Sequence, residues 1–203
     1  MGLYGEQVLP RMVNAACGLK TVEPLRRRVC DGLEGDVVEI GFGSGLNVPF
    51  YPAAVTGVAA VEPADVAWKL ADKRLSATSV PVQRSGLDGQ SLPFADRSYD
   101  AALSTWTLCT IPDARAAVRE IGRVLRPGGT FHFAEHGRAP ESRVQKWQNR
   151  LNGVQQRLAC GCNLNRDITA IIEAGGMTIT SLDTFYAKGD PKILGSTYEG
   201  TAE

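Results

Sequence analysis

The chain has 203 residues, which is enough for one domain with a sizeable core and too few for two full domains. Its 22 basic and 22 acidic residues cancel. This balance argues against the strongly basic surface with which proteins bind nucleic-acid phosphates, so we expect a single domain over residues 1–203 and no nucleic-acid partner.

The N-terminal residues show no targeting signal. MGLYGEQVLPRMV lacks the regions of a signal peptide, and no run reaches the ~18 apolar residues that span a bilayer. The five cysteines are odd in number and scattered, which is typical of free thiols in a reducing compartment. We therefore expect a cytoplasmic protein without stable membrane insertion. Cys160 and Cys162 form a C-x-C pair, but no second pair or histidine cluster completes a zinc site, so we expect no metal.

Apolar residues at helical spacing in residues 6–33 predict one or two helices, and the basic run Arg26–Arg28 there is typical of a solvated helix face. Short apolar runs then alternate with helical segments at 64–75 and 113–125. The runs predict five strands, at 36–40, 55–61, 80–84, 99–104 and 130–135. This alternation predicts an α/β fold with a doubly wound, mostly parallel sheet.

The pattern changes after residue 137. Residues 140–160 and 165–175 predict two further helices, and residues 176–203 contain two strand-like runs with no helix between them. Such a pair predicts an antiparallel hairpin at the sheet edge, which brings the sheet to seven strands.

The stretch VVEIGFGSGLN, residues 37–47, places three glycines at alternate positions after the first predicted strand. Such a turn lets the backbone approach a ligand closely. A phosphate-binding loop of the G-x-x-x-x-G-K-[ST] type is excluded, because no lysine follows the glycines. A dinucleotide-binding turn would have its third glycine at position 46, where Leu46 stands, although Glu62 at the end of the next strand fits that alternative.

Further motifs separate these alternatives. Glu39 precedes the first glycine by two residues, Glu62 and Pro63 end the second predicted strand, and LRPGG at 125–129 precedes the fifth. Together with LPFADRSYDAAL at 92–103, this order resembles the class I S-adenosylmethionine-dependent methyltransferases over residues 36–136. The resemblance implies a Rossmann-like fold, S-adenosylmethionine as cofactor and a small-molecule methyl acceptor as substrate.

The resemblance also implies which residues hold the cofactor. The glycine turn would pass under its amino acid part, Glu62 would accept hydrogen bonds from the ribose hydroxyls, and Asp88 with the Gly89 N–H would meet the adenine. The predicted cofactor-binding residues are Glu39, Gly41, Phe42, Gly43, Gly45, Asn47, Glu62, Pro63, Asp88, Gly89, Ser104, Thr105 and Trp106. The resemblance divides the chain into a helical lid with Tyr4 (1–33), a cofactor-binding core (34–137) and substrate-side helices with terminal strands (138–203).

The acceptor is less well defined. FAEHG, residues 133–137, ends the fifth predicted strand, so we expect Glu135 and His136 as catalytic residues. His132 lies deeper in that strand and is expected in the core. TWTLCTIPD at 105–113 and GCNLNRD at 161–167 are similar to an animal methyltransferase-like group that includes alkyl-thiol methyltransferases. That group begins with a membrane-anchoring segment, which this sequence does not show.

Four residues near the predicted crevice favour a hydrophobic or aromatic acceptor: Trp106, Leu108, Cys109 and Trp147. A looser resemblance to ubiquinone and menaquinone methyltransferases rests on the L-P-F segment, so thiols, phenols and quinols all stay open as acceptors. Two other classes also stay open at this point. One is an NAD(P)-dependent oxidoreductase, against which Leu46 argues, and the other is a catalytically silent cofactor-binding module.

Overall fold

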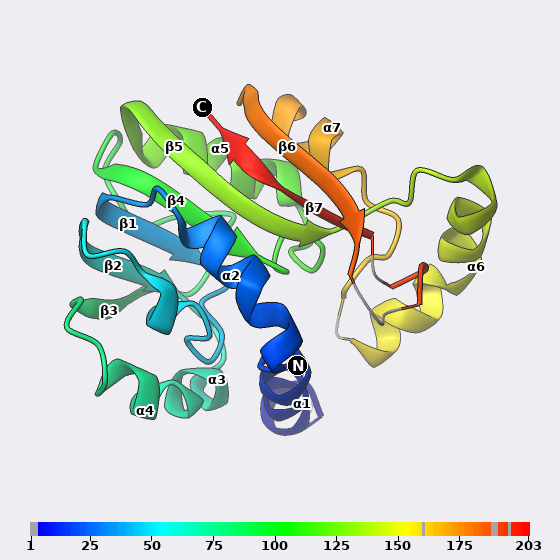
Figure 1. Ribbon diagram of the computed structural model, residues 1–203, viewed down its shortest axis with the longest axis horizontal. Coiled ribbons are helices and arrows are strands. Elements are labelled where there is room, and N and C mark those ends of the chain that lie inside the picture. Colours follow the sequence, from blue (N-terminus) through cyan, green and yellow to red (C-terminus); the bar gives the residue numbers. More distant parts are fainter. Residues whose placement is uncertain (1–3, 160, 188–190, 195) are drawn as a thin grey trace.

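The computed structural model describes residues 4–159, 161–187, 191–194 and 196–203. Over these residues the chain forms a seven-stranded sheet in the order β3-β2-β1-β4-β5-β7-β6 (Figure 1). The strands are β1 (Gly35–Ile40), β2 (Val55–Val61), β3 (Val82–Gly86), β4 (Tyr99–Thr105), β5 (Leu125–His136), β6 (Ile179–Tyr186) and β7 (Ser196–Ala202). The first five run parallel, and β7 is antiparallel to both β5 and β6. The predicted Rossmann-like sheet with its antiparallel C-terminal hairpin is therefore confirmed.

The fifth strand begins earlier than predicted, at Leu125, because the LRPGG turn lies inside it. Leu125 pairs with Tyr99, but the next pair joins Thr130 to Ala101, so four residues bulge out between the two pairs. Gly128 has a φ of 81°, a left-handed conformation that glycine adopts readily. The turn therefore interrupts the ladder without ending the strand.

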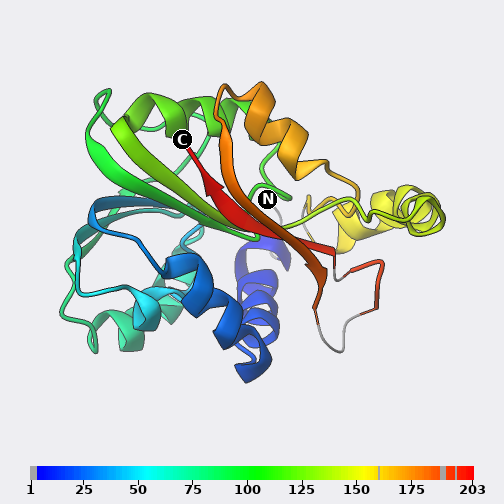
Figure 2. The ribbon, with the colours of Figure 1, turned by 45° about the horizontal axis from the view of Figure 1, so that its top comes forward.

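Helices cover both faces of the sheet. The short helices are η1 (Tyr4–Val8), η2 (Lys20–Val22), η3 (Val48–Phe50), α3 (Asp65–Leu70) and α4 (Asp72–Leu75). The others are α1 (Leu9–Cys17), α2 (Glu23–Cys30), α5 (Ala114–Val124), α6 (Ser142–Leu158) and α7 (Ile168–Ala174). Figure 2 shows α5 and α7 on one face and α2, α3 and α4 on the other. The sheet is thus the middle of three layers, as the alternating pattern predicts.

Helix α5 shows how local sequence sets these boundaries. The Asp113 side chain accepts a hydrogen bond from the Ala116 N–H at 3.0 Å, which caps the N-terminus. The residues that the helix buries recur every three or four positions: Ala114, Ala117, Val118, Ile121 and Val124. They pack with Phe131 and Phe133 of β5 in the larger core cluster. This face fixes α5 on the sheet.

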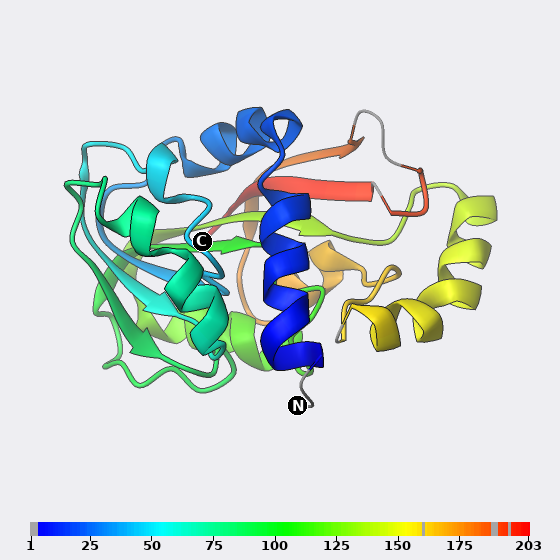
Figure 3. The same cartoon turned by 90° about the horizontal axis from the view of Figure 1, so that it is seen from below.

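Helix α1 and the η1 turn before it lie at the end of the sheet where the parallel strands finish. Figures 1 and 3 show α1 between α3 on one side and α6 on the other. The Tyr4 hydroxyl donates to the Leu158 carbonyl at 2.9 Å, and the Ser44 hydroxyl donates to Asn14 Oδ1 at 2.7 Å. Contacts on both sides thus hold this segment beside the glycine turn. Among the described helices, none is long and apolar enough to cross a bilayer.

Candidate active site

The glycine turn after β1 brings together three left-handed residues with different surroundings. Gly41, Gly43 and Gly45 have φ values of 71°, 59° and 70°. A Cβ on Gly41 would lie 2.0 Å from Thr107 Oγ1, and one on Gly45 would lie 3.1 Å from Phe42 Cζ. On Gly43 the nearest atom would be the Gly41 carbonyl oxygen at 3.8 Å. Gly43 is therefore the glycine of this turn that faces open space.

Glu62, at the end of β2, holds this turn. Its carboxylate accepts hydrogen bonds from the N–H groups of Gly43 and Ala64, both at 2.7 Å. Burial raises the pKa of Glu62, and these two N–H groups partly offset the shift. A carboxylate has about four acceptor positions, so two stay available to a ligand. Phe42, in contrast, packs its ring 5.3 Å from that of Trp68 and is buried, so its side chain belongs to the core.

Asn47 is the centre of a buried polar network beneath the turn. Its amide nitrogen donates to Glu39 Oε1 at 2.9 Å and to Thr105 Oγ1 at 3.0 Å, while its oxygen accepts from Arg26 at 2.6 Å. The Tyr51 hydroxyl donates to the other oxygen of Glu39. The predicted site residues Glu39, Asn47 and Thr105 are therefore in one network that ties β1, β4 and α2 together.

The network makes a testable prediction about pH. Burial raises the pKa of Glu39 to about 7, against hydrogen bonds from Tyr51 and Asn47. Because this folded-state pKa exceeds the unfolded value, the contribution of Glu39 to the free energy of unfolding is complete below about pH 4.5. It is lost as the pH rises through about 7, and the free energy of unfolding then falls by about 3 kcal/mol. We expect the wild type to lose stability relative to Glu39→Gln over this window, measured by urea unfolding. A pH-independent difference in unfolding free energy would contradict this.

Arg26 corrects the prediction that the basic run is a solvated face. Only 4% of Arg26 is exposed, because α2 turns this residue toward the network. Its guanidinium carbon lies 4.7 Å from the centre of the Trp106 ring, and one nitrogen donates to the Cys17 carbonyl at 3.1 Å. Its Nε is buried and has no partner among the described residues. Arg28, in turn, pairs with Glu199.

Trp106 follows β4 in a conformation that is unusual for its residue type. Its φ is 50°, and its N–H donates to the Ala134 carbonyl at 2.8 Å. The ring lies edge-on to that of His136, with 6.3 Å between the centroids. Left-handed backbone at a bulky residue is costly and is concentrated at functional sites. The ends of β4 and β5 thus meet at Trp106 and His136, whose contacts with the cofactor and the acceptor stay predictions.

The loop that carries Asp88 and Gly89 lies beside the end of β1. Asp88 is exposed and accepts from the N–H and side-chain amide of Gln90, which lower its pKa. Gly89 is buried, and a Cβ there would lie 2.6 Å from Ile40 Cγ2. The Gln90 side chain also accepts from the Asp113 N–H at 2.8 Å. These contacts fix the loop, and the adenine contacts of Asp88 and Gly89 stay predictions.

Glu135 is fully buried, and its carboxylate contacts donors from β4 and from the loop that follows it. Its carboxylate accepts from Ser104 Oγ at 2.7 Å, from the Thr107 N–H at 3.0 Å and from the Cys109 N–H at 3.4 Å. Burial raises the pKa of Glu135, and these donors oppose the rise. The carboxylate therefore positions the loop after β4. The Ser104 hydroxyl donates its hydrogen bond to this carboxylate.

A cluster that the sequence did not reveal surrounds His136. A ring nitrogen of His136 and the sulfurs of Cys109 and Cys162 all lie within 4.8 Å of one another, and the two sulfurs are 3.7 Å apart. Hydrogen bonding with Cys109, followed by His136, lowers the pKa of the Cys162 thiol to about 4. Cys160, the other half of the C-x-C pair, lies outside the described residues.

An apolar groove of about 300 Å³ lies next to this cluster. It is lined by Leu151, Val154, Gln155, Leu164, Pro191, Ile193 and Leu194. Gln155 also hydrogen-bonds to Cys162, which connects the groove to the cluster. Of the apolar residues predicted at the crevice, Leu108 is instead fully buried in the core and Trp147 is half exposed on α6.

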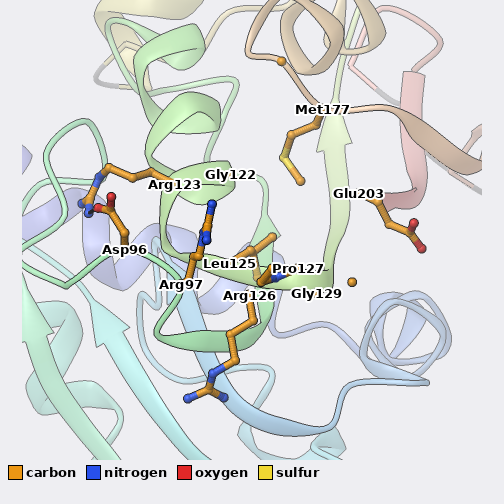
Figure 4. Close-up of a pocket in the computed structure, with 12 residues that line it drawn as sticks. Asp96, Arg97, Gly122, Arg123, Leu125, Arg126, Pro127, Gly129, Met177 and Glu203 are labelled. Atoms are coloured by element: carbon orange, nitrogen blue, oxygen red, sulfur yellow. Dashed lines mark hydrogen bonds and ion pairs between the residues drawn. The ribbon is translucent and has the colours of Figure 1, made fainter.

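A larger pocket of about 450 Å³ is shown in Figure 4. Arg126, Pro127 and Gly129 of the turn within β5 line it, together with Met177 and Glu203. These residues are at the start of β5, whereas His136 is at its end. In open α/β sheets the carboxyl ends of the strands carry the ligand site, so this pocket is not the active-site candidate.

A doubly wound sheet with a glycine turn after β1 and a buried carboxylate after β2 defines a nucleoside-binding class of α/β protein. Residues 38–133 match the family model described as a methyltransferase domain. Human thiol S-methyltransferase TMT1A is 31% identical over 155 residues, or 74% of this chain and 63% of that protein. The chain belongs to the class I S-adenosylmethionine-dependent methyltransferases.

Other relatives differ in the acceptor that their names state. Phosphatidylethanolamine N-methyltransferase of Cereibacter sphaeroides is 28% identical over 145 residues, which are 63% of this chain and 66% of that protein. A putative methyltransferase structure from Bacillus halodurans has a TM-score of 0.69 at 16% identity, with 88% and 94% of the two chains covered. The chain spans about two-thirds or less of the length of the two curated relatives, the human thiol S-methyltransferase and the Cereibacter enzyme. The family is established, and the acceptor is not.

Proposed function

We propose that the protein transfers the methyl group of S-adenosylmethionine to a small apolar acceptor, and that this acceptor is a thiol. The observation that carries this proposal is the apolar groove, because its lining residue Gln155 hydrogen-bonds to Cys162 in the cluster of His136 and two cysteines. An apolar wall with a few convergent polar groups is typical of small-ligand sites. The likeness to human thiol S-methyltransferase supports a thiol over a phenol or a quinol.

The residues after β1 and β2 fit the cofactor. Gly43 leaves space that a side chain would fill, and Glu62 beside it keeps acceptor positions for two ribose hydroxyls. We propose that Arg26 Nε, buried without a partner among the described residues, binds the carboxylate of the cofactor's amino acid part. Asp88 and Gly89 would hold the adenine. The cofactor supplies an electrophilic methyl group, and the protein supplies position and exclusion of water.

We assign different roles to the two predicted catalytic residues. His136 faces the acceptor, beside the Trp106 ring, and assists removal of the acceptor's proton. Glu135 is a positioning residue, because its oxygens hold Ser104 and the N–H groups of the following loop. The N-terminal segment with Tyr4 and α1 covers the cofactor, and residues 34–137 and 138–203 form the cofactor and acceptor sides of one domain. Its cytoplasmic location stays a prediction.

The proposal is tested with isotope-labelled S-adenosylmethionine and matched acceptors: an alkyl thiol, an aromatic thiol, a phenol and a quinol. We expect label in the thioethers and little in the phenol or quinol products. Transfer to the phenol or quinol alone would overturn the thiol assignment, and no transfer to any acceptor despite cofactor binding would indicate a catalytically silent module.

His136→Asn tests the role of the histidine. We expect turnover to fall by about 10²–10⁴-fold at neutral pH, which is the usual contribution of a positioned proton acceptor. The affinity for S-adenosylhomocysteine should stay unchanged, and the loss should shrink at high pH because a thiol ionises near pKa 8.5 without help. Full activity of this variant from about pH 6 to 9 would show that His136 is structural.

A further inference from the structure

The cluster of Cys109, His136 and Cys162 has the dimensions of a metal site. A tetrahedral zinc ion with zinc–sulfur bonds of about 2.3 Å holds two sulfurs about 3.8 Å apart. The sulfurs of Cys109 and Cys162 are 3.7 Å apart. The His136 nitrogen lies within 4.8 Å of both. The His136 nitrogen would have to move by at most about 1.3 Å to reach the roughly 3.5 Å nitrogen–sulfur separation of such a site.

The chain holds the two cysteines together independently of their side chains. The Cys109 carbonyl accepts from both the N–H and the side-chain amide of Asn163, at 2.8 and 3.0 Å. The Asn163 oxygen in turn accepts from Gln156 at 2.6 Å. On the other side, Glu135 accepts from the Cys109 N–H. This support from hydrogen-bonded neighbours resembles the outer shell that orients metal ligands.

The donor atoms also decide which metal suits the site. Two thiolates and one neutral imidazole match zinc. The two negative charges of the thiolates cancel the two positive charges of the ion. In the described part of the chain, no fourth histidine, cysteine, aspartate or glutamate joins the group. Three protein ligands and one open position are the arrangement of catalytic zinc sites.

We propose that Cys109, His136 and Cys162 bind a zinc ion whose fourth position takes the sulfur of the acceptor. This inference deepens the proposed function and rests on it for the choice of a thiol. The acceptor R–SH replaces a zinc-bound water as R–S⁻, and its proton passes to solvent. The water leaves intact and nothing is oxidised or reduced. The ion would lower the acceptor's pKa, and His136 would assist loss of the acceptor's proton through the ion that it binds instead of as a direct proton acceptor.

The metal site is tested first without any methyl transfer. The purified full chain, freed of metal by a chelator, is titrated with Zn²⁺ against a chromophoric competitor, and with Co²⁺ by absorption spectroscopy. We expect one ion per chain and a thiolate-to-cobalt charge-transfer band with intense tetrahedral d–d bands. Cys162→Ala and His136→Asn should each lose more than about 100-fold in zinc affinity. No stoichiometric binding by the wild type would overturn the proposal.

Cys30→Ala is the matched control, because Cys30 is also buried but lies in another core cluster. It should keep full zinc affinity, and each variant should bind S-adenosylhomocysteine, which shows that it is folded. Equal loss of zinc in the control would overturn the assignment of ligands. Cys160→Ala should also keep the affinity. A loss there would show a fourth protein ligand and overturn the open position.

The fourth position is tested with the Co²⁺-loaded protein and an alkyl thiol. We expect the thiol to change the d–d bands and strengthen the charge-transfer band, whereas the corresponding alcohol should not. An unchanged spectrum would overturn thiol coordination. Removal of zinc should slow thiol methylation, and restored zinc should recover it. If the metal-free protein methylates thiols at the same rate, the metal role fails and the proposed function stands. Thiol coordination without methylation would instead count against the function alone.

Discussion

Glu62→Ala is expected to weaken binding of S-adenosylhomocysteine by about 10²-fold or more. The carboxylate would accept two ribose hydroxyls, and each hydrogen bond to a charged group contributes about 1.5–3 kcal/mol. Its present contacts to the Gly43 and Ala64 N–H groups show that it is already oriented at the turn. Calorimetric titration of the variant with S-adenosylhomocysteine measures the effect directly.

Asp65→Ala provides the control for this change. Asp65 lies three residues further along, is exposed, and pairs with Arg84 at 2.7 Å, so its removal changes charge nearby without changing the turn. We expect its affinity for S-adenosylhomocysteine to match that of the wild type. If Glu62→Ala bound as tightly as the wild type, the ribose assignment would be wrong. A loss of equal size in both variants would point to long-range charge as the cause.

Gly43→Ala is expected to remove most of the cofactor affinity while the fold persists. The added Cβ meets no protein atom closer than 3.8 Å, so it would fill the space left for the cofactor. The left-handed φ of 59° adds a strain of about 1–2 kcal/mol to any residue with a Cβ. Thermal unfolding measures this strain, and titration with S-adenosylhomocysteine measures the lost affinity.

Gly128→Ala separates these two effects. Gly128 has a φ of 81° and no atom within 4 Å of an added Cβ, but it lies in the turn at the start of β5. We expect the two alanine variants to lose similar stability, and only Gly43→Ala to lose affinity. Equal affinities in both variants would show that the cofactor does not approach Gly43.

The sheet could be predicted from sequence because its signals are local. Each parallel strand is a short apolar run buried on both faces, and the stretches between them carry helical spacing. The hairpin was predicted for the same reason, since no helical pattern separates its two strands. The position of β7 between β5 and β6 could not be predicted from local sequence patterns. It follows from pairing over a long separation, such as that of Phe131 with Ala202.

The site was predicted in part. Residues that adjoin a strand end, such as Glu62 and His136, are where the alternating pattern places them. The partners of His136 were missed, because Cys109 and Cys162 are 53 residues apart and only the fold brings them together. Arg26 was misread, because a run of like charges does not tell which member faces inward. The role of Glu135 depends on which donors surround it, and sequence does not show them.

The place of β7 has a consequence for the order of folding. His136 pairs with Thr197 of β7, and β6 has β7 as its sheet neighbour. Contacts between residues this far apart in the chain form late, because closing a long loop costs entropy before any contact offsets it. During synthesis, β1 to β5 can assemble while the last strand is still being made. The histidine at the edge of the incomplete sheet therefore gains its final position only in the last step of folding.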